Sequence, residues 1–211
     1  MTLINKAQEP IAQLVLAHGA GANMNSDFMA LVAALFSKRQ ISVIRFDFEY
    51  MQKAAALNRR QPPDRIPKLL SYFSHVLEGL ESSLPLFIGG KSMGGRVATM
   101  LLEESSAIAA ICFGYPFHPP GKLDKLRTEH LYSLHKPLLV VQGSRDTFGA
   151  QEEVTDYGLP ENIETIFMAD GDHSFKPRKK SGFTQEQHII SAIDASAEFI
   201  RQQLVMQKLQ S

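Results

Sequence analysis

The 211-residue sequence contains no tryptophan and one cysteine, and its 22 basic residues are balanced by 22 acidic ones. One cysteine cannot form an internal disulfide, which excludes a disulfide-stabilised miniprotein; we expect Cys112, within an apolar run, to be a small buried hydrophobe. A formal net charge of zero argues against global electrostatic attraction to nucleic acid or to an anionic membrane. We therefore expect neither as a partner.

Long apolar runs and targeting features are also missing. No apolar run approaches the roughly 20 residues needed to cross a bilayer, and the first ten residues lack the charged start and apolar stretch of a signal peptide. No cluster of His, Cys, Asp and Glu has the spacing of metal ligands, and nothing in the sequence requires a cofactor. We expect a soluble, cytoplasmic protein that forms one domain over residues 1–211, without metal or cofactor.

Short apolar runs alternate with stretches of helical periodicity along almost the whole chain. Several runs are apolar at consecutive positions, which is typical of strands covered on both faces in a parallel sheet. The sequence therefore predicts an α/β fold, with a mostly parallel open sheet and helices on both faces. The expected strands are residues 14–17, 41–46, 84–88, 108–113, 137–141 and 163–168. The expected helices are residues 28–39, 66–80, 93–102, 123–134 and 184–209.

One motif has the form of a turn that bears a nucleophile. Gly90-Lys91-Ser92-Met93-Gly94 fits G-x-S-x-G and stands between an expected strand and an expected helix. The motif needs a sharp turn that exposes the serine oxygen with a helix N-terminus behind it. A phosphate-binding loop, G-x-x-x-x-G-K-S, competes for the same residues, but it requires glycine where the chain has Pro85. We therefore predict that Ser92 is a catalytic nucleophile.

A serine nucleophile needs a base and an orienting acid, which follow this motif in the order Ser, Asp or Glu, His. Asp146 follows one expected strand and His173 lies in a loop past the last one, so both lie at the sheet edge of Ser92. We predict that His173 transfers the proton and that Asp146 fixes its tautomer. Taken singly, they are compatible with a turn-capping aspartate and a surface histidine. Asp170 and Asp172 are rival acids, but their closeness to His173 favours turn roles.

The negative charge that develops on a substrate oxygen needs backbone N–H donors. Met93, directly after the nucleophile, is the first expected donor. The second is expected from the small-residue loop after the first parallel strand, where Ala20 is the first choice and Gly21 the alternative. His18 in this loop is expected to brace it by hydrogen bonding.

Four segments form one set of motifs: Leu16-Ala-His-Gly-Ala-Gly21, Gly90-Lys-Ser-Met-Gly94, Gly143-Ser-Arg-Asp146 and Gly171-Asp-His173. Together they resemble the α/β-hydrolase superfamily over about residues 12–205, which implies a serine hydrolase fold with a Ser-Asp-His triad. Three further segments are Arg45-Phe-Asp-Phe48, Gly114-Tyr-Pro-Phe-His-Pro-Pro-Gly121 and Asp172-His-Ser-Phe-Lys-Pro-Arg178. They resemble a group of small bacterial hydrolases, related to the hydrolase-like region of a subunit of a eukaryotic histone acetyltransferase complex. The chain is also loosely similar to dienelactone-hydrolase-like proteins, whose nucleophile is cysteine where this chain has Ser92.

The site is expected to have little or no lid, because only roughly 20 residues separate the strands that flank the usual insertion point. An open site suits small or macromolecule-borne acyl groups better than long lipid chains. The basic run Lys176–Lys180 is either a solvated loop or a means of attracting an anionic substrate. Residues expected to line the pocket, with core or turn packing as the alternative, are Met24, Tyr50, Met51, Tyr115, Phe117 and Phe175.

Two functional hypotheses follow. The first is a serine hydrolase that cleaves a carboxylic ester or thioester of a small-molecule or acylated substrate through an acyl-enzyme. The second is a non-catalytic scaffold or protein-binding module on the same fold. The presence of all three triad residues favours the enzyme, because unused catalytic residues are free to drift.

Overall fold

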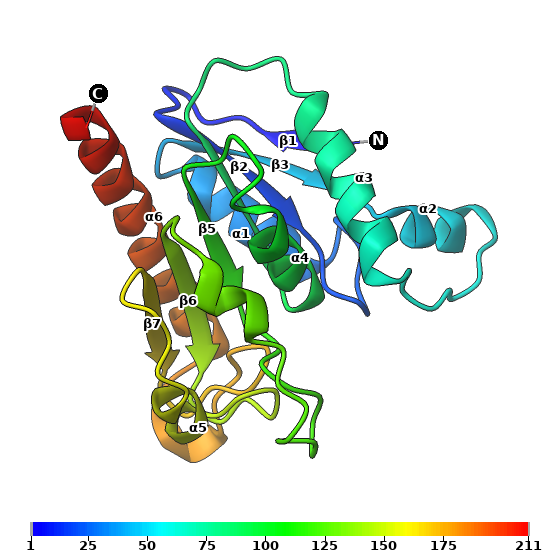
Figure 1. The fold of residues 1–211 in the computed structure, drawn as a ribbon. Helices are drawn as coiled ribbons and strands as arrows, with labels where there is room; N and C mark the ends of the chain where they lie inside the picture. The colour runs from blue at the N-terminus through cyan, green and yellow to red at the C-terminus, as the bar shows by residue number, and fades with distance from the viewer. Residues whose placement is uncertain (1, 211) are drawn as a thin grey trace.

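The computed structural model describes residues 2–210, whose seven strands form one sheet (Figure 1). The strand order is β1-β3-β2-β4-β5-β6-β7, and every neighbouring pair is parallel except β1 with β3. Six of the strands therefore end at the same edge of the sheet. The strands are β1 (Thr2–Asn5), β2 (Ala12–Ala17), β3 (Ile41–Phe46), β4 (Leu86–Lys91), β5 (Ala109–Phe113), β6 (Leu138–Gly143) and β7 (Ile163–Met168).

Helices cover both faces of the sheet. α1 (Asp27–Ser37) and α6 (Gln185–Gln210) pack on one face, and α3 (Ile66–Glu78) and α4 (Met93–Leu101) on the other (Figure 1). Alternation along β2 supplies both cores, since Leu14 and Leu16 face α1 and α6 while Val15 and Ala17 face α3 and α4. The predicted α/β sheet with helices on both faces is confirmed.

The connection between β5 and β6 carries no inserted lid domain. Residues 114–137 hold one short 3-10 helix, η1 (Glu129–Ser133), so the predicted helix 123–134 is wrong over most of its length. Leu123 and Leu126 are 59% and 48% exposed. Their helical spacing therefore has no core to face, and a helix gains most of its stability from packing such a face.

Three short elements lie outside the sequence-based expectation. β1 is a four-residue edge strand with half of its residues exposed, α2 (Glu49–Ala56) spans eight residues, and α5 (Gln151–Asp156) spans six. Each is too short for hydrophobic periodicity to distinguish it from a loop. Within the described residues, no helix combines the length and the apolar character needed to cross a membrane.

Candidate active site

Ser92 lies on the sharp turn between β4 and α4. Its backbone has φ 52° and ψ −116°, which is strained for a residue with a side chain. A Cβ added at Gly90 would lie 2.5 Å from the Gly94 carbonyl carbon and 2.6 Å from the Ala17 oxygen. One at Gly94 would lie 2.5 Å from that same oxygen. Both glycines are therefore required for the close approach that presents Ser92 at the sheet edge.

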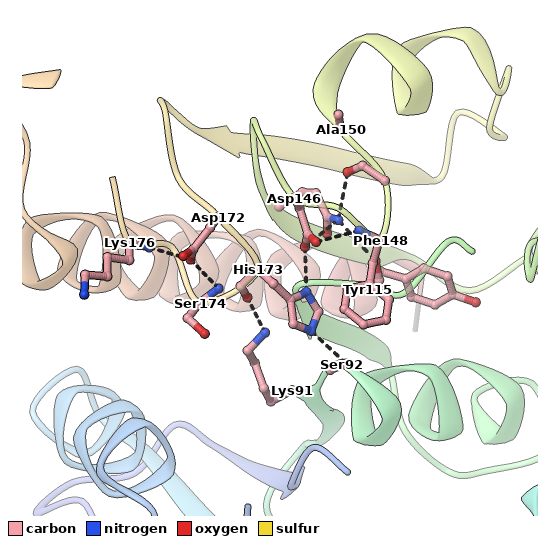
Figure 2. A network of polar contacts seen from close by, with 12 residues as sticks. Lys91, Ser92, Tyr115, Asp146, Phe148, Ala150, Asp172, His173, Ser174 and Lys176 are labelled. Carbon is pink, nitrogen blue, oxygen red and sulfur yellow. Dashed lines mark hydrogen bonds and ion pairs between the residues drawn. The ribbon is translucent and has the colours of Figure 1, made fainter. Parts of the chain in front are cut away.

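The structure brings Ser92, His173 and Asp146 into one hydrogen-bonded series (Figure 2). The Ser92 Oγ lies 2.9 Å from the His173 Nε2, and the His173 Nδ1 lies 2.7 Å from the Asp146 Oδ2. A carboxylate only accepts, so Nδ1 carries the imidazole proton and Nε2 is free to accept the Ser92 hydroxyl proton. This is the arrangement in which a serine can be activated as a nucleophile.

The two rival acids take other roles. Asp170 accepts hydrogen bonds from Arg178, and the side-chain bond from Arg178 lowers the pKa of Asp170 to about 2. Asp172 Oδ1 accepts from the backbone amides of Ser174 and Lys176, at 2.8 and 3.0 Å, and so closes the turn after His173.

Gln142 orients the carboxylate of Asp146, and sequence analysis did not single it out. Asp146 has no exposed surface, and a buried carboxylate needs hydrogen-bond donors. The Gln142 Nε2 donates to Oδ2 at 3.0 Å, and the Phe148 amide donates to Oδ1 at 2.9 Å. The sequence signal that could have identified it is a glutamine directly after the apolar run Leu138–Val141, within the same expected strand region.

Lys91 is a second residue that sequence analysis did not assign a role. Its Nζ donates to the backbone oxygen of His173 at 2.5 Å (Figure 2) and lies 5.8 and 5.7 Å from the ring centroids of Phe28 and Phe175. Burial lowers the pKa of Lys91 to about 8, against the opposing effects of the Asp146 and Asp172 charges. The ammonium group thus ties the loop of His173 to the strand that carries Ser92.

The loop after β2 is braced as expected by His18. The Phe48 amide donates to the His18 Nε2 at 3.1 Å, so the proton is on Nδ1, which donates to the Gly19 oxygen at 2.7 Å. Burial lowers the pKa of His18, in agreement with a neutral ring. His18 therefore fixes the path of the loop that faces Ser92.

The Arg45-Phe-Asp-Phe48 segment holds the far end of this loop. The Asp47 Oδ1 accepts from the Met24 amide at 2.7 Å, and the Arg45 guanidinium donates to the Met24 oxygen. The Tyr50 hydroxyl donates to the Ala20 oxygen at 3.2 Å. This motif, which the sequence marked only through a resemblance, thus has a physical role in positioning the loop.

The expected oxyanion donors lie on the two sides of Ser92. A Cβ added at Gly19 would be 3.7 Å from the Ser92 Cβ, so the loop that continues into Ala20 and Gly21 runs directly beside the serine. Within residues 2–210, the amides of Ala20, Gly21 and Met93 donate to no backbone or side-chain acceptor. They are therefore available to a substrate oxygen, and the choice between Ala20 and Gly21 stays a prediction.

Five of the six residues predicted to line the pocket have almost no exposed surface, and the sixth, Met51, is half-buried and packs against the core. The alternative of core packing therefore applies to them in this structure. A side chain buried to this degree supports a pocket wall from behind and offers no surface to a substrate. A hollow of about 450 Å³ lies instead beside the loop after β2, lined by Ala20, Gly21, Arg60, Gln61, Pro62 and Pro63. The exposed fractions are Met24 4%, Tyr50 3%, Tyr115 0%, Phe117 0% and Phe175 0%.

The basic run after His173 is partly engaged by the protein itself. Arg178 pairs with Asp170, and its Nε lies 2.7 Å from the Asp170 Oδ1. Lys179 and Lys180 begin the 3-10 helix η2 (Lys179–Ser181) and are exposed. Across residues 2–210, no group of three or more His, Cys, Asp or Glu side chains is placed to hold a metal ion.

Comparison with known proteins agrees with the fold. Residues 10–201 match the α/β hydrolase domain family. Est1E from Butyrivibrio proteoclasticus, solved with ferulic acid bound, is 14% identical with a TM-score of 0.70, over 97% of this chain and 95% of that one. An α/β serine hydrolase without a lid from Xanthomonas campestris is 17% identical with a TM-score of 0.68, over 95% and 88% of the two chains.

A dienelactone hydrolase from Anabaena variabilis is also similar, with 17% identity and a TM-score of 0.71 over 95% of this chain and 90% of that one. At these identities the likeness establishes the fold alone. The predicted fold class, with little or no lid, is confirmed.

Proposed function

Because the chain belongs to the α/β-hydrolase family, we propose that it is a serine hydrolase that cleaves a carboxylic ester or thioester. The observation that carries the proposal is the series of hydrogen bonds at 2.9 Å from Ser92 to His173 and at 2.7 Å from His173 to Asp146. This series joins a nucleophile, a base with an unprotonated nitrogen, and a buried carboxylate that stabilises the protonated base. The amides of Ala20 and Met93 complete the site as oxyanion donors.

In the first half-reaction, the Ser92 Oγ attacks the carbonyl carbon of the substrate while its proton passes to the Nε2 of His173. The carbonyl electron pair moves onto oxygen, where the amides of Ala20 and Met93 donate hydrogen bonds to it. When this intermediate collapses, the bond to the leaving alcohol or thiol breaks and His173 gives that group the proton. The acyl group is then esterified to Ser92.

Water completes the cycle. His173 takes a proton from a water molecule, whose oxygen attacks the acyl carbon and forms a second tetrahedral intermediate. Its collapse breaks the bond to the Ser92 Oγ, which recovers its proton from His173. The net reaction is ester plus water to carboxylic acid plus alcohol, or the corresponding thiol.

Small or macromolecule-borne acyl groups are the substrates that fit best. The β5–β6 connection holds one 3-10 helix and no inserted domain, which favours an open site. The hollow of about 450 Å³ beside the loop after β2 is at the small end of ligand pockets. The ferulic acid bound to Est1E, a protein of similar fold, supports a small carboxylic acid as the acyl product.

The proposal is tested with a fluorophosphonate probe, which reacts covalently with activated serines. Wild-type protein is compared with Ser92→Ala and His173→Ala, and His75→Ala on the exposed surface of α3 serves as the matched histidine control. We expect labelling of wild type and of His75→Ala, and loss of labelling in the other two. No labelling of folded wild type would overturn the proposal in favour of a non-catalytic scaffold.

A further inference from the structure

Two half-buried arginines, Arg96 in the first turn of α4 and Arg127 in the β5–β6 connection, have no carboxylate partner. Within residues 2–210, no Asp or Glu oxygen lies within 4 Å of the guanidinium of Arg96 or Arg127. The Nε of Arg96 is buried and donates to no acceptor. Of the other arginines that are not exposed, Arg39, Arg145 and Arg201 are paired with carboxylates. Arg45 donates instead to the oxygens of Met24 and Asn5. A guanidinium charge that is partly removed from water without a carboxylate partner is unfavourable, so Arg96 and Arg127 need an explanation.

Polar contacts fix the main chain at both arginines. The Tyr115 hydroxyl donates to the Arg127 backbone oxygen at 2.8 Å and lies 3.5 Å from the His130 Nε2. That Nε2 lies 2.9 Å from the Thr99 Oγ1, and the Thr99 hydroxyl donates to the Arg96 backbone oxygen at 2.8 Å. Hydrogen bonds thus join the β5–β6 connection to α4 beside Arg96.

Arg96 is also close to the nucleophile along the chain. Its backbone amide donates to the Ser92 backbone oxygen at 3.0 Å, so Arg96 closes the first turn of α4, directly after the serine. Figure 2 shows the Tyr115 hydroxyl directed away from His173.

The neighbouring groups leave the positive charge uncompensated. Burial lowers the pKa of Arg127, and the charge of Arg96 lowers it further, so the two guanidinium groups interact repulsively. Burial lowers the pKa of His130 to about 4, again with a contribution from Arg96, which keeps His130 neutral near pH 7. The Tyr115 hydroxyl forms a hydrogen bond with the Arg96 side chain, but burial raises the pKa of Tyr115, so this hydroxyl stays neutral and supplies no negative charge.

We propose that Arg96 and Arg127 form a subsite that binds an anionic group of the substrate, a carboxylate or a phosphate, next to the ester bond that Ser92 attacks. Guanidinium groups bind both anions through paired N–H donors, and each such bond is charge-assisted. The inference deepens the proposed function and rests on it, since it assigns the substrate class of the same site. The run Lys176–Lys180 is less suited, because its arginine already holds Asp170.

The test compares two substrates and two soluble anions. The substrates are 4-nitrophenyl butyrate and the 4-nitrophenyl monoester of glutarate, which differ by a carboxylate at the end of the acyl chain. Glutarate and inorganic phosphate, at constant ionic strength, are the competitive inhibitors of butyrate hydrolysis, and their relative strength distinguishes the two anions. The variants are Arg96→Gln and Arg127→Gln, with Arg201→Gln on α6 as the control that removes the same charge elsewhere.

We expect inhibition of wild type by at least one of the two anions, and weakening of this inhibition by roughly 10-fold to 100-fold in each subsite variant. If the anion is carried on the acyl chain, the ratio of kcat/KM for the glutarate monoester to that for butyrate falls by a similar factor. Arg201→Gln should behave as wild type. Because Arg96 and Arg127 lie on different elements, misfolding of one variant leaves the other to decide.

The inference is overturned if neither anion inhibits wild type, or if inhibition is unchanged in both variants. Equal loss of both substrates with unchanged inhibition indicates a structural role and also overturns it. These outcomes are distinct from failure of the proposed function, in which neither ester is hydrolysed and the fluorophosphonate probe does not label Ser92.

Discussion

The Nζ of Lys91 donates a hydrogen bond to the backbone oxygen of His173, at 2.5 Å, although the two residues are 82 positions apart in the sequence. The residue before the proposed nucleophile therefore holds the main chain of the proposed base. A single side chain links the two turns whose relative position sets the 2.9 Å contact between Ser92 and His173. Activity of the proposed hydrolase should depend on this link.

Replacing Lys91 by methionine removes the donor while keeping a similar side-chain length. We expect kcat to fall roughly 10-fold with KM changed by less than about twofold, because positioning of the base affects the transition state more than substrate binding. Steady-state kinetics on 4-nitrophenyl butyrate measure both constants, and Lys38→Met on the exposed end of α1 is the matched control. An unchanged kcat in Lys91→Met would exclude the positioning role.

The pH dependence of stability follows from the same lysine. Its pKa is about 8 in the folded protein against 10.5 ordinarily, so between these values the unfolded chain binds more protons and stability rises with pH. We expect the free energy of unfolding of wild type to rise relative to that of Lys91→Met by on the order of 1–3 kcal/mol between pH 8 and 10.5. Urea unfolding of both proteins across this range measures the difference, and parallel curves would contradict it.

Asp146→Asn should reduce kcat by roughly 10⁴-fold, because an amide in place of the carboxylate favours the wrong tautomer of His173 and cannot stabilise its protonated form. Asp172→Asn is the matched control. It keeps an oxygen for the amides of Ser174 and Lys176, so we expect a loss below about 10-fold. Kinetics of the two variants decide which carboxylate serves His173, and the reverse order of effects would assign that role to Asp172.

Gly90→Ala should destabilise the protein by about 1–3 kcal/mol or more, because the added Cβ would lie within 2.6 Å of three backbone atoms. Gly21→Ala is the matched control, since nothing lies within 4 Å of its added Cβ, and its stability should stay within about 0.5 kcal/mol of wild type. Thermal or urea unfolding measures both. Equal stabilities would show that the turn at Ser92 can relax around a side chain.

Much of the fold was predictable because its information is local. Consecutive apolar residues in 108–113 and 137–141 predicted the buried strands β5 and β6, and helical spacing in 66–80 predicted α3. β1 was missed because an antiparallel edge strand of four residues, paired only with β3, has no periodicity of its own. The helix expected over 123–134 failed because spacing does not reveal whether a core lies opposite.

The candidate site divides in the same way. Ser92, Asp146 and His173 could be proposed from a motif and from chain order, and the structure brings them within hydrogen-bond distance, while their catalytic roles stay predictions. The residues that line the pocket could not be identified from the sequence, because an aromatic residue near the sheet edge is equally suited to the core. Tyr115 and Phe117 lie in that core.

The sequence by itself determined the strand–turn–helix at Ser92, the order of the expected triad residues and the alternation of strands and helices, because each depends on neighbours along the chain. Only the tertiary structure decided that Lys91 holds the loop of His173, that Gln142 orients Asp146, and that Arg96 and Arg127 lie together without a carboxylate. These contacts join residues from different elements. They depend on strand order, register and helix packing, which periodicity along one segment does not specify.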